Sequence, residues 1–300
     1  MENILNKPIN NPVESFLLNL GSNITADTYR IVITVFCKFS FETADFGTIN
    51  WSKLNHISVL KFIRFKSKIN AHTTVNLYLT IIKGLSKECW QYGLISIEAF
   101  MLIQSVKKLK GHRNRAGRAL DIDEINKIIE YFNSCKSNRS VRNRAIFALA
   151  CGAGLRRREI SAVNIENIDT ESLSTIGKGN KERTVYLSKF VKSSIKEWVK
   201  RIKSTKGALF VGVDRFDKIG EKRIGYGGIH RVMQVISEET NLKKFTAHDL
   251  RRTFATLLLD SKADRFAVQH LMGHSSLSTT ELYDRRGDNA MIEAIRLLPF

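Results

Sequence analysis

A stretch near the end of the chain places basic side chains where they could hold a phosphate. Thr246 and Asp249 have the spacing of a capping box, which predicts that a helix begins at Thr246. His248 and Arg251 would then lie three residues apart, on one face of the first two turns. A helix start that presents an arginine and a histidine is well suited to bind a phosphate group.

A tyrosine follows at a distance that could bring it into the same cleft. Ser278 and Glu281 also have capping-box spacing, so a second helix is predicted to begin at Ser278. Tyr283 would lie just beyond the first turn of that helix. The phosphate clamp and the tyrosine hydroxyl together predict a tyrosine that attacks a phosphodiester.

The charge of the chain indicates a polyanionic partner. Its 300 residues include 48 lysines and arginines but only 29 acidic residues, a formal net charge of +19. This excess predicts nucleic acid as the partner, in preference to a merely basic protein without one. We expect phosphate contacts to dominate the affinity for double-stranded DNA, so binding should weaken steeply with salt.

Composition also limits the class of protein. Four widely spaced cysteines, Cys37, Cys89, Cys135 and Cys151, are expected to be reduced packing residues. No apolar run reaches the roughly 18 residues of a membrane span. The first residues lack the basic and apolar regions of a signal peptide. These features predict a cytoplasmic protein.

Hydrophobic periodicity divides the chain into two regions. Apolar residues recur at helical spacing in residues 1–106, which predicts a small helical bundle. Residues 107–119 contain six basic residues, two glycines and no acid, so they are expected to form an interdomain linker lying along DNA rather than a solvated loop. The six basic residues are Lys107, Lys108, Lys110, Arg113, Arg115 and Arg118.

The remainder, residues 120–300, is predicted to be a mixed α/β domain with a tail helix at its end. Two predicted strands, 173–176 and 183–187, flank a turn whose residues tolerate positive φ. This pattern indicates a hairpin with Lys178 at its tip. The whole chain is therefore expected to be mainly α with a small β-sheet.

Five blocks of residues, in this order, resemble the tyrosine recombinases of the phage-integrase and Xer-like group. The blocks are Gly154-Leu155-Arg156 with Glu159, Gly177 to Arg183, His248 to Arg251, Leu271 to His274, and Thr279 to Tyr283. The complete set in order, with His274 nine residues before Tyr283, is far more specific than any single block. The N-terminal half is similar only in kind, as a helical core-binding domain. The resemblance implies a tyrosine-recombinase catalytic domain in the second half.

The resemblance also implies an active DNA strand-transferase that needs no metal, ATP or other cofactor. Tyr283 would be the nucleophile that forms a 3′-phosphotyrosine. Arg156 and Arg251 would hold the two non-bridging oxygens of the scissile phosphate, where negative charge develops. Lys178 would protonate the leaving 5′ oxygen, with Lys181 as the alternative.

Supporting roles follow from the same resemblance. His248 would help to remove the tyrosine proton or hold the phosphate, and His274 would donate a further hydrogen bond to it. Glu159 would orient the basic cluster, and Arg252 would contact the DNA backbone. His270 and His274 also have the spacing of a zinc site, but a helix end expected between them argues against one.

The resemblance implies dimers and tetramers on DNA, with strands exchanged through a Holliday junction in integration, excision or resolution. Accessory DNA-bending proteins are possible further partners. The tail helix predicted near residues 289–297 could dock on a neighbouring copy or on its own domain. A prokaryotic or phage origin and a nucleoid-associated location are expected. Two other functions stay open, namely a topoisomerase IB-like relaxing enzyme and a non-catalytic DNA-binding regulator of the same fold.

Overall fold

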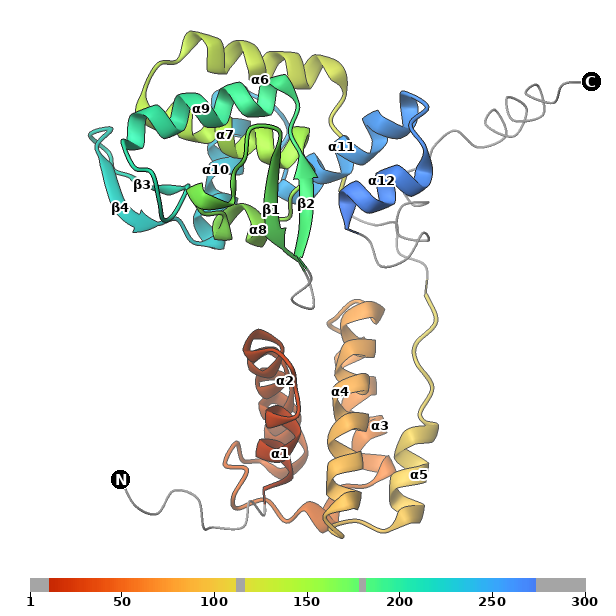
Figure 1. Cartoon of the computed structure of the whole chain (residues 1–300). Coiled ribbons are helices and arrows are strands. Elements are labelled where there is room, and N and C mark those ends of the chain that lie inside the picture. Colours follow the sequence, from red (N-terminus) through yellow and green to blue (C-terminus); the bar gives the residue numbers. More distant parts are fainter. Residues whose placement is uncertain (1–10, 112–116, 178–181, 274–300) are drawn as a thin grey trace, which may run out of the picture. The chain divides into compact units, whose positions relative to one another are not determined.

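The computed structural model describes residues 11–111, 117–177 and 182–273 (Figure 1). The chain divides into two compact units, Met1–Asn114 and Arg115–Phe300. Helices dominate both units, as the sequence predicted. No helix in the described ranges combines the length and the apolar character that crossing a membrane requires.

The first unit is a bundle of helices with a core of aliphatic and aromatic side chains. Its elements are α1 (Pro12–Leu18), α2 (Asn23–Phe41), η1 (Trp51–Lys53), α3 (His56–Ser67), α4 (His72–Gln91) and α5 (Ile97–Ser105). Along α4, the residues Val75, Leu79, Ile82 and Leu85 are fully buried at the helical spacing that predicted them.

The second unit contains most of the remaining elements. Its helices are α6 (Ile122–Ser134), α7 (Asn138–Gly152), α8 (Arg157–Ala162), η2 (Ile165–Asn167), α9 (Lys189–Ile202), α10 (Tyr226–Glu239), α11 (Ala247–Asp260) and α12 (Arg265–Met272). Its strands are β1 (Ser172–Ile176), β2 (Glu182–Tyr186), β3 (Val211–Val213) and β4 (Ile219–Arg223).

Helix α7 is the centre of the second unit. Its residues from Ala145 to Cys151 are all buried, because this second half of the helix is apolar on every side. Helices α6, α9, α10 and α11 pack around it (Figure 1). The packing of α11 against α7 therefore fixes the position of α11. The C-terminal end of α7 leads directly into the loop before α8.

The predicted hairpin is present as the antiparallel pair of β1 and β2. Ser172 lies opposite Tyr186, and Ile176 lies opposite Glu182. The tip, residues 178–181, lies outside the described residues. A second antiparallel pair, β3 and β4, was only partly predicted. A strand was expected at residues 209–211, but β3 begins only at Val211, and Leu209 and Phe210 are buried in the core before it. Strand β4 was not predicted, because its residues are too polar and exposed to show the alternation of a half-buried strand.

The four cysteines are free thiols, and three of them pack in the two cores. Cys37, Cys89 and Cys151 are buried, whereas Cys135 is partly exposed. Burial raises the pKa of each buried thiol to about 12. These three are packing residues, as the sequence predicted.

Candidate active site

A tight turn places Arg156 next to α11. Gly154 has a φ of +62°, a left-handed conformation that favours glycine. A Cβ at this position would lie 2.5 Å from the ring of Phe254, which belongs to α11. The glycine therefore allows the loop to approach α11 closely before Arg156 caps the start of α8.

The predicted capping box at the start of α11 is confirmed. The backbone N–H of Asp249 donates to the hydroxyl of Thr246 at 3.3 Å, and the backbone N–H of Thr246 donates to the carboxylate of Asp249 at 2.9 Å. This start leaves His248 exposed in the first turn. Arg251, three residues later, is only 2% exposed.

A buried carboxylate, that of Glu159, lies among three arginines. It accepts hydrogen bonds from Arg156 at 2.7 Å and from Arg183 at 3.0 Å, and Arg251 lies 3.9 Å away. Burial alone would raise the pKa of Glu159. The backbone N–H of Arg156 and the charges of Arg183 and Arg156 outweigh burial and lower it. The carboxylate is therefore ionised at neutral pH and holds the arginines in one cluster.

Backbone carbonyls fix the guanidinium of Arg251. One terminal nitrogen donates to the carbonyl of Gly154 and the other donates to the carbonyl of Met272. The loop before α8, the middle of α11 and the end of α12 therefore meet at this single side chain. Two carbonyl acceptors and a carboxylate define the plane of the guanidinium before any substrate binds.

Arg183 is a member of this cluster to which the sequence assigned no role of its own. It comes from β2 and donates to the backbone carbonyl of Leu271 and to Glu159. Arg156 donates to the carbonyl of Gly273 at 3.1 Å, immediately after α12. The predicted end of this helix at Gly273 is confirmed. Both arginines thus hold the segment that leads into His274, which lies outside the described residues.

A cavity of about 430 Å³ opens beside the cluster. It is lined by Arg156, Arg157, Arg158, His230, Thr246, Ala247, His248 and Arg251. The described lining contains four arginines and two histidines but no acid, so it is suited to an anionic ligand. The guanidinium carbons of Arg157 and Arg158 lie 5.1 Å and 5.6 Å from the ring centre of Tyr226, which supports both at the rim.

Comparison with known proteins establishes the family. The model of the phage integrase family matches residues 118–289, more than half of the chain. The chain belongs to the phage integrase family. Tyrosine recombinase XerC of Lactobacillus delbrueckii subsp. bulgaricus is 28% identical over 242 residues, which cover 79% of this chain and 80% of that protein. Its counterpart in Chromohalobacter salexigens is 27% identical over 281 residues, covering 91% and 90%.

Solved structures show the same fold. The XerH site-specific recombinase bound to a palindromic difH substrate matches with a TM-score of 0.69 and 19% identity, covering 91% of this chain and 80% of that one. A lambda integrase dimer bound to a COC′ core site matches with a TM-score of 0.70 and 17% identity, covering 91% and 93%. The mainly helical architecture with small antiparallel sheets is therefore that of the tyrosine recombinases.

The structure places only some of the predicted site residues together at the cavity. Arg156, Glu159, His248 and Arg251 converge at the cavity and its supporting cluster. Arg113, Arg115, Lys178, Lys181, His274 and Tyr283 lie outside the described residues. His230 is an addition that only the fold reveals, because α10 carries no motif that marks it. Arg157 and Arg158 directly follow Arg156 in the sequence, and the structure places both in the lining of the cavity.

The predicted DNA-binding residues that the structure describes differ in their surroundings. Lys107, Lys108 and Lys110 are all exposed. The guanidinium of Arg118 donates to Glu124 and to the carbonyl of Lys243, so it is held against the protein. Arg252 donates to the carbonyl of Gly117 at 2.7 Å. Contacts of these five residues with DNA stay predictions.

His248 lies among positive charges that change its acidity. Partial burial and the charges of Arg252, Arg251 and Arg156 lower its pKa below the ordinary 6.5, against the opposing effect of Asp249. The imidazole is therefore mostly neutral at pH 7 and able to accept a proton. A bound phosphodiester would offset the arginine charges, so we expect DNA binding to raise this pKa.

NMR titration of the imidazole signals, with His248→Gln used for assignment, would measure both pKa values. In the free protein His248 should titrate below 6.5. Arg252→Gln should raise that value, because it removes the arginine charge that lowers the pKa most without touching the helix cap. A free-protein pKa at or above 6.5, or a pKa that DNA leaves unchanged, would contradict this account of the site.

Proposed function

We propose that this chain is a site-specific tyrosine recombinase that cuts and rejoins duplex DNA, with Tyr283 as its nucleophile. The convergence of Arg156 and Arg251 beside one cavity, around the buried carboxylate of Glu159, carries the proposal. Phosphoryl transfer develops negative charge on the non-bridging oxygens, and two fixed guanidinium groups would stabilise that charge. Membership of the phage integrase family and relatives named tyrosine recombinase support the same reading.

In the proposed reaction, the Tyr283 oxygen forms a bond to phosphorus while the bond from phosphorus to the 5′ oxygen breaks. The tyrosine proton passes to a base, for which the neutral imidazole of His248 is the proposed acceptor. Lys178 protonates the leaving 5′ oxygen, with Lys181 as the alternative. The products are a 3′-phosphotyrosine and a free 5′ hydroxyl. Attack by a second 5′ hydroxyl reverses these steps, joins the strands and releases Tyr283.

Duplex DNA is the proposed partner, and similar solved structures are complexes with DNA. We propose a helical core-binding domain at 1–106, a basic linker at 107–119 and a catalytic domain at 120–300, which together grip the duplex. Two copies would bind each site, and two such sites would come together as a tetramer and exchange strands through a Holliday junction. Action on chromosomal or phage DNA would place the protein at the nucleoid in the cytoplasm, and accessory DNA-bending proteins could assist.

Covalent trapping tests this function and identifies the target sequence in the same experiment. The protein is incubated with a pool of nicked duplexes whose arms are random, and DNA attached to protein is recovered under denaturing conditions and sequenced. The wild type should recover one sequence class, and Tyr283→Phe should recover none. Tyr186→Phe is the matched control, because Tyr186 is 69% exposed on β2 and should leave the adduct intact.

Three other outcomes would favour different functions. An adduct at unrelated sequences, with relaxation of supercoiled DNA by a single copy, would indicate a topoisomerase IB-like enzyme. Selective binding of one sequence without any adduct would indicate a DNA-binding regulator. An adduct that survives in Tyr283→Phe would retain the reaction class but reject the proposed nucleophile.

A further inference from the structure

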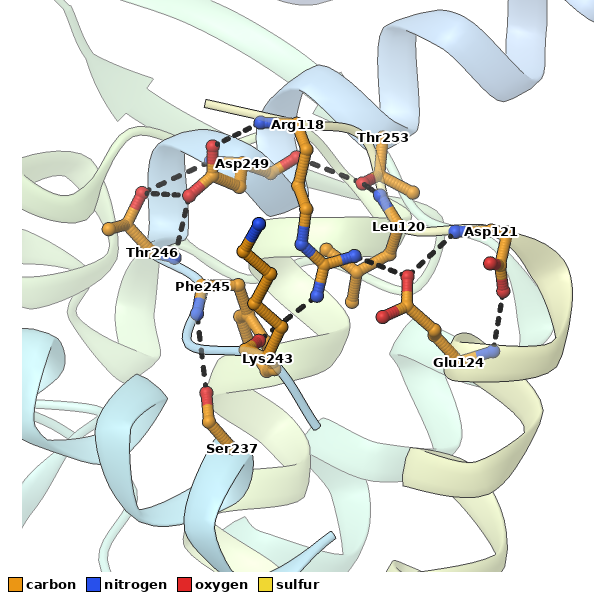
Figure 2. Close-up of polar contacts among 10 residues, drawn as sticks. All are labelled: Arg118, Leu120, Asp121, Glu124, Ser237, Lys243, Phe245, Thr246, Asp249 and Thr253. Atoms are coloured by element: carbon orange, nitrogen blue, oxygen red, sulfur yellow. Dashed lines mark hydrogen bonds and ion pairs between the residues drawn. The ribbon is translucent and has the colours of Figure 1, made fainter. Parts of the chain in front are cut away.

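A short segment at the end of the basic stretch lies along α11 (Figure 2). We call residues 117–120 the strap. The backbone N–H of Arg118 donates to the Asp249 carboxylate at 3.1 Å, and the backbone N–H of Leu120 donates to the Thr253 hydroxyl at 2.8 Å. Thr253 is fully buried and Leu120 is 3% exposed. The strap is therefore hydrogen-bonded to α11 where water cannot easily replace the partners.

Three further contacts hold the strap. At its start, Arg252 donates to the carbonyl of Gly117 at 2.7 Å. The guanidinium of Arg118 also donates to the carbonyl of Lys243 at 3.0 Å and to Glu124 at the start of α6 (Figure 2). The strap is thus bound to α11 along its length and clamped to the segment just before that helix.

The strap and the cavity lie on adjacent sides of the same helix. Asp249, Arg252 and Thr253 are three and four residues apart, so they share the side that binds the strap. His248 and Arg251 come one residue before Asp249 and Arg252, which places them on the neighbouring side facing the cavity. A movement of α11 against the strap would therefore move both cavity side chains.

The carboxylate of Asp249 connects the strap to the helix start. Its Oδ1 accepts from the strap at Arg118, whereas its Oδ2 accepts from the N–H and the hydroxyl of Thr246 at 2.9 Å and 2.8 Å. Each oxygen thus has a separate task, and the residue is only 7% exposed. The side chain of Asp249 therefore caps the start of α11 and also sets the distance between α11 and the strap.

We propose that the strap positions the first turns of α11, and that Gly117, Asp249 and Thr253 are positioning residues for His248 and Arg251. This inference relies on the proposed function for its kinetic readout, but not for its structural readout. None of the three positioning residues lines the described cavity, so they act through α11 and not on the phosphate.

Gly117 offers a substitution that disturbs the strap without changing α11 itself. Its φ is +127°, which disfavours other residues, and a Cβ would lie 2.8 Å from the Asp249 carboxylate. Gly117→Ala should push the strap away from Asp249. Gly207→Ala is the matched control, because Gly207 also has a positive φ of +89° but has no neighbouring atom within 4 Å of the added Cβ.

Thr253 offers a second test, made from the helix side. Thr253→Val has a similar shape but removes the oxygen that accepts from the Leu120 N–H, whereas Thr253→Ser keeps it. The pair separates the strap contact from general packing at a fully buried position. It also supplies an answer if Gly117→Ala fails to fold.

The kinetic experiment separates binding from cleavage. DNA affinity is measured in a Tyr283→Phe background, and single-turnover cleavage is measured on the trapped nicked site. Gly117→Ala and Thr253→Val should bind DNA like the wild type but cleave roughly ten- to a hundredfold more slowly, as expected for a displaced catalytic group. Thr253→Ser and Gly207→Ala should cleave normally. Normal cleavage by a folded Gly117→Ala or Thr253→Val, or an equal loss of binding and cleavage, would overturn the proposal.

Hydrogen exchange gives the structural readout and needs no activity. Backbone amides of residues 247–251 should exchange faster in Gly117→Ala and Thr253→Val than in Gly207→Ala and the wild type. Unchanged exchange in both strap variants would reject the strap as a positioning element, whether or not the wild type forms an adduct. Absence of a wild-type adduct together with faster exchange would reject the proposed function and retain the strap.

Discussion

Replacing Arg251 with lysine is expected to slow DNA cleavage by roughly 10²- to 10³-fold, the effect of removing one preorganised donor to a developing oxyanion. The guanidinium uses two nitrogens to bind the carbonyls of Gly154 and Met272. A lysine ammonium is a point charge on a flexible stem and cannot reproduce this planar, two-ended arrangement. The positive charge would be retained, so the loss would report geometry and not net charge.

Single-turnover cleavage of the trapped nicked site measures this effect, and a gel-shift titration measures DNA affinity in parallel. Arg144→Lys is the matched control, because Arg144 is a partly buried arginine of α7 that pairs with Glu197 at 3.6 Å and does not line the cavity. It should cleave near the wild-type rate. If Arg251→Lys also cleaved at that rate, the guanidinium would not be the group that holds the scissile phosphate.

Local signals in the sequence predicted the start of the site helix correctly. The Thr246 and Asp249 capping box depends on two residues that are three positions apart, and such a short contact can be read without a fold. The end of α12 at Gly273 is predictable for the same reason. Helical spacing located the cores because burial of one face requires it.

Contacts between distant segments could not be predicted in this way. Arg183 belongs to the site cluster because its guanidinium reaches the carbonyl of Leu271, 88 residues further along the chain. Arg118 looked like one more basic residue of a linker. Its side chain is instead held by Glu124 and by a carbonyl of Lys243, 125 residues away. The tertiary packing of the second unit decides which arginines line the cavity and which form contacts within the protein.

The same limit explains why the strap was not expected. Composition marked residues 107–119 as one basic stretch, because charge and glycine content do not change within it. The backbone groups of Gly117 and Leu120, at the end of this stretch and just after it, nevertheless form hydrogen bonds with side chains of α11. A stretch that is uniform in charge can therefore change from solvent contact to structural contact within a few residues.

Replacing Glu159 with glutamine is expected to lower the free energy of unfolding by about 3–5 kcal/mol at pH 7, the usual cost of removing one partner from a buried ionic cluster. The carboxylate is 3% exposed and balances Arg156, Arg183 and Arg251. Glutamine fits the space but brings no negative charge, and its NH₂ group would face a guanidinium donor. Cleavage should also fall, because the guanidinium of Arg156 loses the carboxylate charge that helps to fix it.

Acidification supplies the decisive comparison. The pKa of Glu159 in the folded protein lies below its ordinary 4.5, so its stabilising effect is complete above pH 4.5 and is lost as the pH falls through the folded-state value. Urea unfolding at a series of pH values should therefore show the wild type and Glu159→Gln converging below pH 4.5. Glu171→Gln is the control, because that carboxylate is 74% exposed and its pair with Lys192 should be worth less than about 1 kcal/mol. A constant difference at every pH would mean that the shape of Glu159, and not its charge, holds the arginines together.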